Sequence, residues 1–290
     1  MAKCIFSIDV EDWFHFLNLP ATPKISEWDR LPSSVEKNFL QTLELFTVSE
    51  IKVTCFFLGW IARKYPHLVQ EADRMGHEIA SHGMVHRLVY DMSAAEFSTD
   101  AKESKDILEN IAGHKILGYR AAGFSVTDKT PWVFEKLLEA GYAYDSSIFP
   151  TKWTKKVTHG GGMLTNHYGP HMISIAKQEI AEFPVSVKNV FRQPLCFFGG
   201  AYLRFFPYFM IKRAALDVLK EGRPICFYVH PREIDPSHPR LTMNPILRLP
   251  AYMNLKTTEK KIREIIRDFQ FETFQAYLER KAPQMQRVYL

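Results

Sequence analysis

Two groups of residues in this sequence have the types and the spacing needed to bind a metal ion. Asp9, Glu11 and Asp12 end the first hydrophobic run in SIDVEDWFH, and His82 and His86 follow in SHGMVH. A carboxylate and two imidazoles suit a hydrolytic zinc or similar divalent ion that keeps one coordination position open for water. A further acid near that water could act as a general base. These residues therefore indicate metal-assisted hydrolysis.

The spacing within each group adds detail to this prediction. Asp9 and Glu11 alternate along an extended strand, so their side chains leave on the same face, whereas Asp12 would turn off that face. His82 and His86 are four residues apart, which would place both imidazoles on one side of a helical turn. At least one of the three acids is expected to bind the metal.

Hydrophobic runs of strand length alternate with amphipathic stretches of helix length along most of the chain. This alternation is typical of a parallel sheet covered by helices. Ser93 and Glu96 form a capping box at the start of one helix. The patterns predict strands at 4–8, 53–58, 78–80, 116–119, 143–145, 180–183 and 225–229, and helices at 33–47, 62–74, 94–111, 131–140 and 208–219.

About seven strand-helix units indicate a barrel or an open doubly wound sheet, and in both architectures functional groups gather at the carboxyl ends of the strands. We therefore expect the candidate residues to meet at one edge of the sheet. A segment rich in Gly, His, Thr and Lys, 151–171, is expected to form a loop beside them. The polar residues that follow predicted strands are Asp9 to Asp12, Ser81, His82, Arg120, Asp145 and His230.

The composition describes one enzyme-sized globular domain. The chain has 290 residues, of which 46% are hydrophobic, so it can bury a large core without disulfides. We expect a single catalytic domain over 1–290, with the charged segment 257–290 as a helical extension packed on it. Basic residues exceed acidic ones by only 5 and are scattered, so no nucleic-acid partner is expected.

Cysteine usage and hydropathy provide a prediction of the cellular compartment. The four cysteines form no CxxC pair and lie in apolar stretches, so we expect buried thiols rather than disulfides. The first residues do not form a signal peptide, and no run is long enough to span a membrane. The sequence as given is therefore expected to be cytoplasmic, and its oligomeric state stays open.

A family resemblance emerges from the motifs taken together. The succession SIDVED, VTCFFLG, GHEIASHGMVH, GYRAAGFS, YDSSIFP, EFP and FYVHPREID resembles the NodB-homology polysaccharide deacetylases, carbohydrate esterase family 4. More closely, it resembles the branch found in bacterial exopolysaccharide and surface-glycan gene clusters. The resemblance implies an α/β fold with a distorted (β/α) barrel of about seven strands and a divalent metal, for which zinc is expected. It implies removal of an acetyl group from a sugar or glycan, with N-acetyl favoured over O-acetyl.

The resemblance also implies roles for the residues of the two first motifs. Asp9 corresponds to the catalytic base of the family, and His82 and His86 correspond to its two metal-binding histidines. Either Glu11 or Asp12 corresponds to the metal carboxylate. The i+2 spacing favours Glu11, whereas adjacency to the turn favours Asp12.

Later motifs are expected to complete the site. Arg120 corresponds to the arginine that orients the base by a charge-assisted hydrogen bond. His230 corresponds to the histidine of the last motif, which would donate a proton to the departing sugar nitrogen. Trp13, Phe124 and Tyr202 are candidates for an aromatic platform under the sugar.

Three points stay open at this stage. Asp145 could orient His230 or could cap a turn. Gly199 and Gly200 in FFGGAY indicate a tight turn rather than a phosphate site, because no helix-opening GxGxxG or GKS pattern follows. The alternative functions are hydrolysis of another C–N bond in a small cyclic amide and non-catalytic glycan binding by the same barrel.

Overall fold

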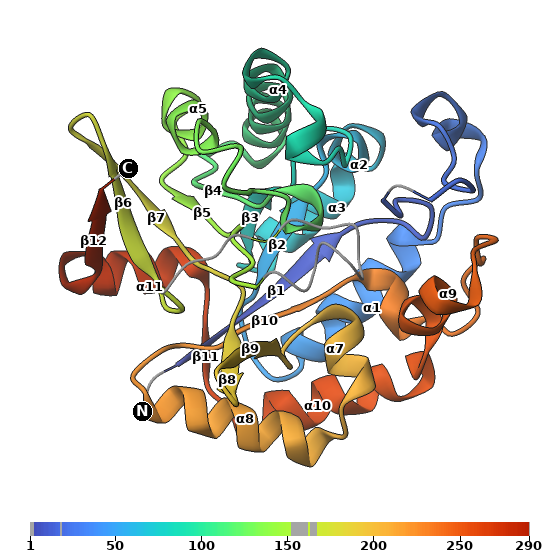
Figure 1. Cartoon of the computed structure of the whole chain (residues 1–290). Helices are drawn as coiled ribbons and strands as arrows, with labels where there is room; N and C mark the ends of the chain where they lie inside the picture. Colours follow the sequence, from blue (N-terminus) through green and yellow to red (C-terminus); the bar gives the residue numbers. More distant parts are fainter. Residues whose placement is uncertain (1–2, 18, 152–161, 163–166, 290) are drawn as a thin grey trace.

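Seven parallel strands form the centre of the fold (Figure 1). The computed structural model describes residues 3–17, 19–151, 162 and 167–289, so most of the segment 151–171 lies outside the described residues. The strands are β1 (Cys4–Val10), β2 (Thr54–Phe57), β3 (Glu78–Ser81), β4 (Gly118–Tyr119), β5 (Tyr144–Asp145), β7 (Gln178–Glu182) and β10 (Cys226–Val229). They lie in the order β10-β1-β2-β3-β4-β5-β7, each parallel to its neighbours. Each corresponds to a predicted strand, which confirms the α/β class.

Further strands extend this sheet and were not predicted. β6 (His171–Ile175) runs antiparallel to β7, and β12 (Gln286–Tyr289) pairs with β6. β11 (Phe271–Glu272) pairs with β1. β8 (Val187–Val190) and β9 (Gln193–Cys196) form a separate hairpin. Among the described residues no ladder joins β10 to β12, so closure of the predicted barrel is not shown.

Helices cover the sheet and connect its strands. The predicted helix 62–74 is two helices, because Pro66 lacks an N–H group and begins a new helix. The predicted capping box is present, since Ser93 Oγ accepts a hydrogen bond from the Glu96 amide. The helices are α1 (Val35–Thr47), α2 (Gly59–Lys64), α3 (Pro66–Arg74), α4 (Ala94–Ala112), α5 (Val133–Glu139), α7 (Gly200–Phe205), α8 (Tyr208–Lys220), α9 (Pro245–Tyr252), α10 (Thr258–Asp268) and α11 (Phe274–Lys281). Short 3-10 turns are η1 (Ile25–Arg30), η2 (Val89–Asp91), η3 (Ala122–Phe124), η4 (Pro231–Ile234), η5 (Leu255–Thr257) and η6 (Ala282–Gln284).

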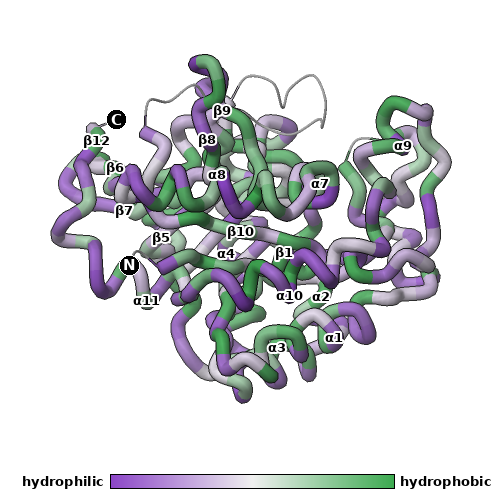
Figure 2. The backbone as a smooth tube through the Cα atoms, turned by 90° about the horizontal axis from the view of Figure 1, so that it is seen from below, coloured by the Kyte–Doolittle hydropathy of each residue, from purple (hydrophilic) through white to green (hydrophobic). Residues whose placement is uncertain are grey.

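The C-terminal segment 257–290 is not only the expected helical extension. It supplies α10 and α11, but its strands β11 and β12 also join the main sheet. Seen from below, α10 alternates between hydrophilic and hydrophobic residues, as a helix packed on a core requires (Figure 2).

The central strands are buried on both faces, as a helix-covered parallel sheet requires. Every residue of β1 and β2 is buried. All four cysteines are buried and unpaired, as expected. Within the part of the chain that the structure describes, no helix has the length and hydropathy needed to cross a bilayer.

The two glycines of FFGGAY allow α7 to begin against β10. Gly200 has a φ of 52°, a left-handed conformation that glycine adopts easily. A Cβ atom on Gly199 would lie 2.0 Å from Cδ1 of Tyr228, so only glycine permits this approach. The glycines therefore serve a close-packed turn, which supports the turn interpretation of this motif.

A buried carboxyl pair lies where β5 and β7 end. Asp145 and Glu182 are paired in the strand register, and both are fully buried. Ser147 Oγ donates to Asp145 Oδ1 at 2.5 Å, and the Ile148 amide donates to Glu182 Oε1 at 3.0 Å. Burial raises the pKa of Asp145 to about 6, and burial together with the charge of Asp145 raises the pKa of Glu182 well above its usual value. The two carboxyl groups therefore share a proton, and among the described residues the hydrogen-bond partner of the His230 ring is Glu233 rather than Asp145.

This pair should make folding stability depend on pH. The folded state binds the shared proton more tightly than the unfolded chain, so the pair destabilises the fold as the pH rises from about 4.5 through about 6. Glu182→Gln removes one ionisable group and keeps a hydrogen-bond donor. We expect the free energy of unfolding of this variant, relative to wild type, to increase by about 1 kcal/mol or more between about pH 5 and about pH 8.

Urea denaturation at both pH values measures this difference. Glu44→Gln, on the exposed side of α1, is the matched control and should follow wild type. A Glu182→Gln variant whose stability changes in parallel with wild type would contradict the shared proton.

Candidate active site

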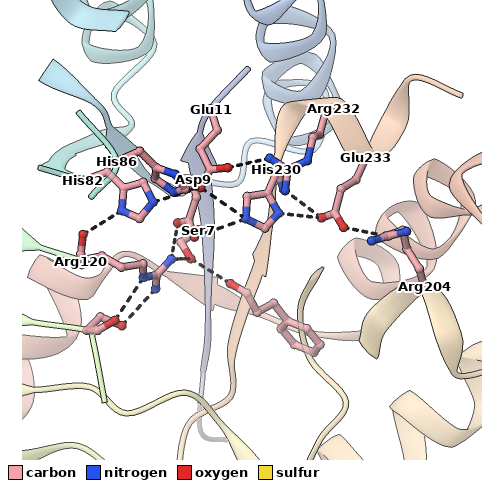
Figure 3. Close-up of polar contacts among 12 residues, drawn as sticks. Ser7, Asp9, Glu11, His82, His86, Arg120, Arg204, His230, Arg232 and Glu233 are labelled. Carbon is pink, nitrogen blue, oxygen red and sulfur yellow. Dashed lines mark hydrogen bonds and ion pairs between the residues drawn. The ribbon is translucent and has the colours of Figure 1, made fainter. Parts of the chain in front are cut away.

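Glu11, His82 and His86 come together at the carboxyl edge of the sheet (Figure 3). Glu11 directly follows β1 and His82 directly follows β3, and both strands pair with β2. Each of the three residues offers one ligand atom, and these atoms all lie within 4.8 Å of one another. Glu11 Oε1 is 3.2 Å from His82 Nε2 and 2.8 Å from His86 Nε2. All three side chains are buried, so this is an enclosed group of one acid and two imidazoles.

The two histidines are arranged as metal ligands would be. The carbonyl oxygen of Arg120 lies 2.8 Å from His82 Nδ1, so Nδ1 is assigned as the protonated nitrogen and Nε2 keeps its lone pair toward Glu11. His86 Nε2 is buried and lies 2.8 Å from Glu11 Oε1, but the angles at this contact are not those of a hydrogen bond. A fixed tautomer and a buried nitrogen without a hydrogen bond both fit a divalent cation held by Glu11 and the two imidazoles.

The loop between the two histidines differs from the predicted helical turn. Residues 82–88 belong to no helix, and His86 has a φ of 52°, which an α-helix does not allow. The i, i+4 spacing therefore brings the rings together through an irregular loop. Their ring centroids are 5.2 Å apart.

Asp12, the other possible ligand, faces away from this cluster. Its Oδ2 accepts a hydrogen bond from Ser33 Oγ at 2.5 Å, and its Oδ1 accepts one from Ser34 Oγ at 3.1 Å. The amide of Trp13 also donates to Oδ1 at 2.8 Å. Asp12 therefore fixes the chain before α1, and of the two alternatives only Glu11 lies beside the histidines.

Asp9 and Arg120 form a buried ion pair beside the cluster. Arg120 Nη1 donates to Asp9 Oδ1 at 2.5 Å and to Ser7 Oγ at 2.8 Å. Its Nη2 donates to Ser146 Oγ at 3.0 Å, and its guanidinium carbon lies 4.0 Å from the centroid of the Phe56 ring. Arg120 thus holds one carboxylate oxygen of Asp9 and leaves Oδ2 on the side of His230.

His230 lies on the far side of Asp9, at the end of β10. Its Nε2 is 4.0 Å from Asp9 Oδ2 and 3.7 Å from Glu11 Oε1. Its Nδ1 is 3.2 Å from Glu233 Oε2, and its backbone amide donates to the same oxygen at 3.0 Å. Arg204 Nε in turn donates to Glu233 Oε1 at 2.7 Å. A buried Arg-Glu-His chain therefore orients the imidazole.

Sequence reasoning missed three charged residues of this site: Arg204, Arg232 and Glu233. Glu233 had a local signal, because an acid three residues after His230 has the spacing of a capping box, which forms at the start of η4. Arg232 Nη1 donates to Glu11 Oε2 at 2.6 Å. Arg204 lies far from the motifs along the chain, and no local pattern identifies it.

The surrounding charges keep Glu11 and Glu233 ionised. Burial opposes ionisation of Glu11, but His86, His230 and Arg232 outweigh it and hold the pKa of Glu11 well below its usual value. Burial also opposes ionisation of Glu233, and Arg204 with His230 likewise lowers its pKa. Burial lowers the pKa of His86, whereas at His82 burial is outweighed by Glu11 and Asp9, which raise its pKa. A metal ion would require both imidazoles to be neutral.

These groups open onto one cavity of about 210 Å³. Phe124 and Tyr202 line it, as a sugar platform would require. Trp13 does not: it is buried, and its Nε1 donates to the carbonyl oxygen of Pro32 at 2.8 Å, so this aromatic residue serves the core. The apolar lining residues are Phe16, Leu17, Leu19, Phe124, Phe149, Ala201, Met243, Leu247, Pro250 and Ala251.

Comparison with known protein families divides the chain in two. Residues 25–144 match the polysaccharide deacetylase family, and residues 146–279 match a domain of unknown function, DUF3473. The first match contains His82, His86 and Arg120, and the second contains His230. Asp9 and its neighbours precede both.

Individual relatives agree with this family. A peptidoglycan-N-acetylglucosamine deacetylase from Bacillus cereus is 29% identical over 102 residues, which cover 35% of this chain and 46% of that protein. The chain spans between 44% and 63% of the length of the curated relatives that it matches.

Solved structures share the fold. A protein from Mycobacterium smegmatis, named as a candidate polysaccharide deacetylase, superposes with a TM-score of 0.63 over 100% of this chain and 94% of its own. The Puue allantoinase superposes with a TM-score of 0.61 over 97% of this chain and 90% of its own. Both are 17% identical to this chain, so these two likenesses show the fold alone.

The cluster should bind a divalent cation that stabilises the folded state. We expect excess Zn²⁺ to raise the free energy of unfolding by about 3 kcal/mol at roughly a hundred times its dissociation constant. His86→Ala should lose most of this increase, because it removes one of three ligands. Thermal unfolding with and without Zn²⁺ measures it, and His114→Ala, an exposed histidine bonded to Asp73, is the control. An unchanged Zn²⁺ effect in His86→Ala would exclude this cluster as the binding site.

Proposed function

We propose that this chain, a member of the polysaccharide deacetylase family, is a metal-dependent hydrolase that removes N-acetyl groups from a sugar of a bacterial polysaccharide or surface glycan. One observation carries the proposal: Glu11, His82 and His86 share a cavity with an ion-paired Asp9 and an oriented His230 (Figure 3). The N-acetyl specificity is proposed from the Bacillus cereus relative, which is named for that reaction. Zinc is proposed as the ion because its ligand preference fits one carboxylate and two imidazoles.

Asp9 is positioned to act as the general base. A divalent ion held by Glu11, His82 and His86 would supply a Lewis acid and a water of lowered pKa. Arg120 binds Oδ1 of Asp9, so the carboxylate keeps one orientation and presents Oδ2 to the cavity. A carboxylate held in this way accepts a proton from the attacking water without first reorganising.

His230 is positioned to act as the general acid. Glu233 accepts a hydrogen bond from Nδ1, which directs Nε2 toward Asp9 and the cavity. The 4.0 Å between His230 Nε2 and Asp9 Oδ2 is longer than a hydrogen bond, so the two groups flank the cavity rather than bind each other. From this position a protonated imidazole donates to the departing sugar nitrogen.

Acetate release tests the proposed reaction directly. We expect the zinc-loaded protein to release acetate from at least one member of a panel of N-acetylated sugar nucleotides and oligosaccharides. Asp9→Asn should lower kcat by about 10²–10⁴-fold, because the amide cannot accept the proton. Metal analysis of this variant should show wild-type zinc, since Asp9 is not among the three ligands.

Three outcomes would contradict the proposal or one of its assigned roles. Ring opening of a cyclic amide such as allantoin, without acetate release, would assign the site to another C–N bond. Glycan binding without turnover by the zinc-loaded protein would make this chain a non-catalytic barrel. Wild-type turnover by Asp9→Asn at full zinc occupancy would overturn the role of the base.

We propose that Glu233 orients His230 for proton donation. Substrates with different leaving groups can distinguish this role from a purely structural one. An N-acetyl sugar needs a proton on its departing nitrogen, whereas an aryl acetate releases a stable phenolate without one. We expect Glu233→Gln to lower kcat on the amide by roughly 10–100-fold and to change aryl acetate hydrolysis by less than about threefold. Glu139→Gln, on α5, is the control and should leave both reactions unchanged. Equal losses on both substrates would show that Glu233 only supports the fold.

A further inference from the structure

Two segments beside the cavity contain no acidic residue. Residues 183–216 and 236–258 lack Asp and Glu altogether, yet they carry five and three basic residues, respectively. They meet in space, because Arg204 donates hydrogen bonds to the carbonyl oxygens of Pro250, Ala251 and Met253. α7 and α9 accordingly lie side by side (Figure 1). Four of the five basic residues of the first segment form ion pairs with acids outside it, so the cations of the two segments that lack an ion pair with a described residue are Arg192, Arg240, Arg248 and Lys256.

The same segments expose most of the large hydrophobic side chains that reach the surface. Among the described residues, 11 large hydrophobic side chains are exposed; five of them lie in the first segment and two in the second. Scattered single residues of this kind are normal, but a concentration in one region indicates a contact surface. The seven are Phe191, Phe205, Phe209, Met210, Leu216, Ile246 and Leu249.

α9 is apolar on two faces. Leu247, Pro250 and Ala251 line the cavity. On another face, 82% of Ile246 and 64% of Leu249 are exposed. A helix that is hydrophobic on both sides is normally buried on both, so the outer face of α9 lacks its partner.

The junction of α7 with α8 exposes hydrophobic side chains of a similar kind. Phe205 ends α7 and is 58% exposed, and Phe209 begins α8 and is 71% exposed. Exposed cations accompany these groups: Arg248 lies on α9 and Lys256 lies in η5, and neither forms an ion pair with a described residue. Phe205, Phe209, Ile246, Leu249, Arg248 and Lys256 are here named the α9 surface.

The chemistry of the α9 surface selects among its possible occupants. Aromatic and aliphatic side chains next to unpaired cations suit the interface of an anionic bilayer, where rings and aliphatic groups enter the headgroup region and cations bind phosphates. A second copy of this chain would bring cations against cations. A nucleic acid would use the cations but not the aliphatic side chains.

We propose that the α9 surface docks this protein on an anionic lipid membrane. Because the opposite face of α9 lines the cavity, docking brings the wall of the cavity to the lipid surface. This points to an acetylated glycan held at the membrane by a lipid carrier as the class of substrate, an extension that rests on the proposed deacetylase function. The docking itself does not depend on catalysis.

Cosedimentation with lipid vesicles tests the docking. We expect wild type to bind vesicles containing phosphatidylglycerol at least tenfold more tightly than vesicles of phosphatidylcholine alone. The double variant Ile246→Glu with Leu249→Glu should weaken binding at least tenfold, and Phe209→Glu should weaken it from the α8 side. Val48→Glu, an exposed hydrophobic residue at the end of α1, is the matched control and should bind as wild type does.

One control assay and three possible outcomes complete the test of the docking. Acetate release from a free, water-soluble N-acetyl sugar should be unchanged in the double variant, which verifies its fold and cavity without involving lipid. Equal binding to both vesicle types, or wild-type binding by the double variant, would overturn the docking whatever the enzyme assay shows. A dimer detected by light scattering in wild type and lost in the double variant would assign the surface to a second copy and also overturn it.

Discussion

The site depends on a network of charges that are stable under burial only because each is paired. Removing a buried charge from its partner costs several kcal/mol, roughly 3–5 kcal/mol when one member of a pair is deleted. Asp9 has Arg120, Glu233 has Arg204, and Glu11 has Arg232. The first and third pairs join β1, or the residue directly after it, to distant segments, and the second joins η4 to α7, so the acids at the carboxyl edge of the sheet are paired and oriented.

The pairing also explains why the acids of the first motif behave differently. Asp9 lies near the end of β1 and Glu11 directly follows the strand, two residues later, and both line the cavity. Asp12 follows directly, turns to the serines before α1, and fixes the direction in which the chain leaves the site. One short run therefore supplies a candidate base, a candidate ligand and a structural anchor.

The parallel strands and most of the candidate site residues were predictable from the sequence. The remaining features were not, and the causes are physical. All seven parallel strands were predicted because both of their faces are buried, which produces hydrophobic runs. β8 and β12 escaped prediction because they are short, partly exposed and mixed in polarity. Glu11 could not be separated from Asp12 because the choice depends on hydrogen bonds across 21 and 22 residues of sequence. The sequence around Trp13 does not distinguish a sugar-binding aromatic residue from a core residue. Its burial and its hydrogen bond to the carbonyl oxygen of Pro32 make the distinction.

The division of the chain between two family matches does not divide the site. The deacetylase match contains His82, His86 and Arg120, which hold a candidate metal and the candidate base. The DUF3473 match contains His230 with its supporting Glu233 and Arg204, and also the α9 wall of the cavity. Arg204 binds Glu233 through Nε and the end of α9 through its other nitrogens. One side chain thus couples the orientation of His230 to the position of α9, so this half of the chain sets both the candidate proton donor and one wall of the cavity.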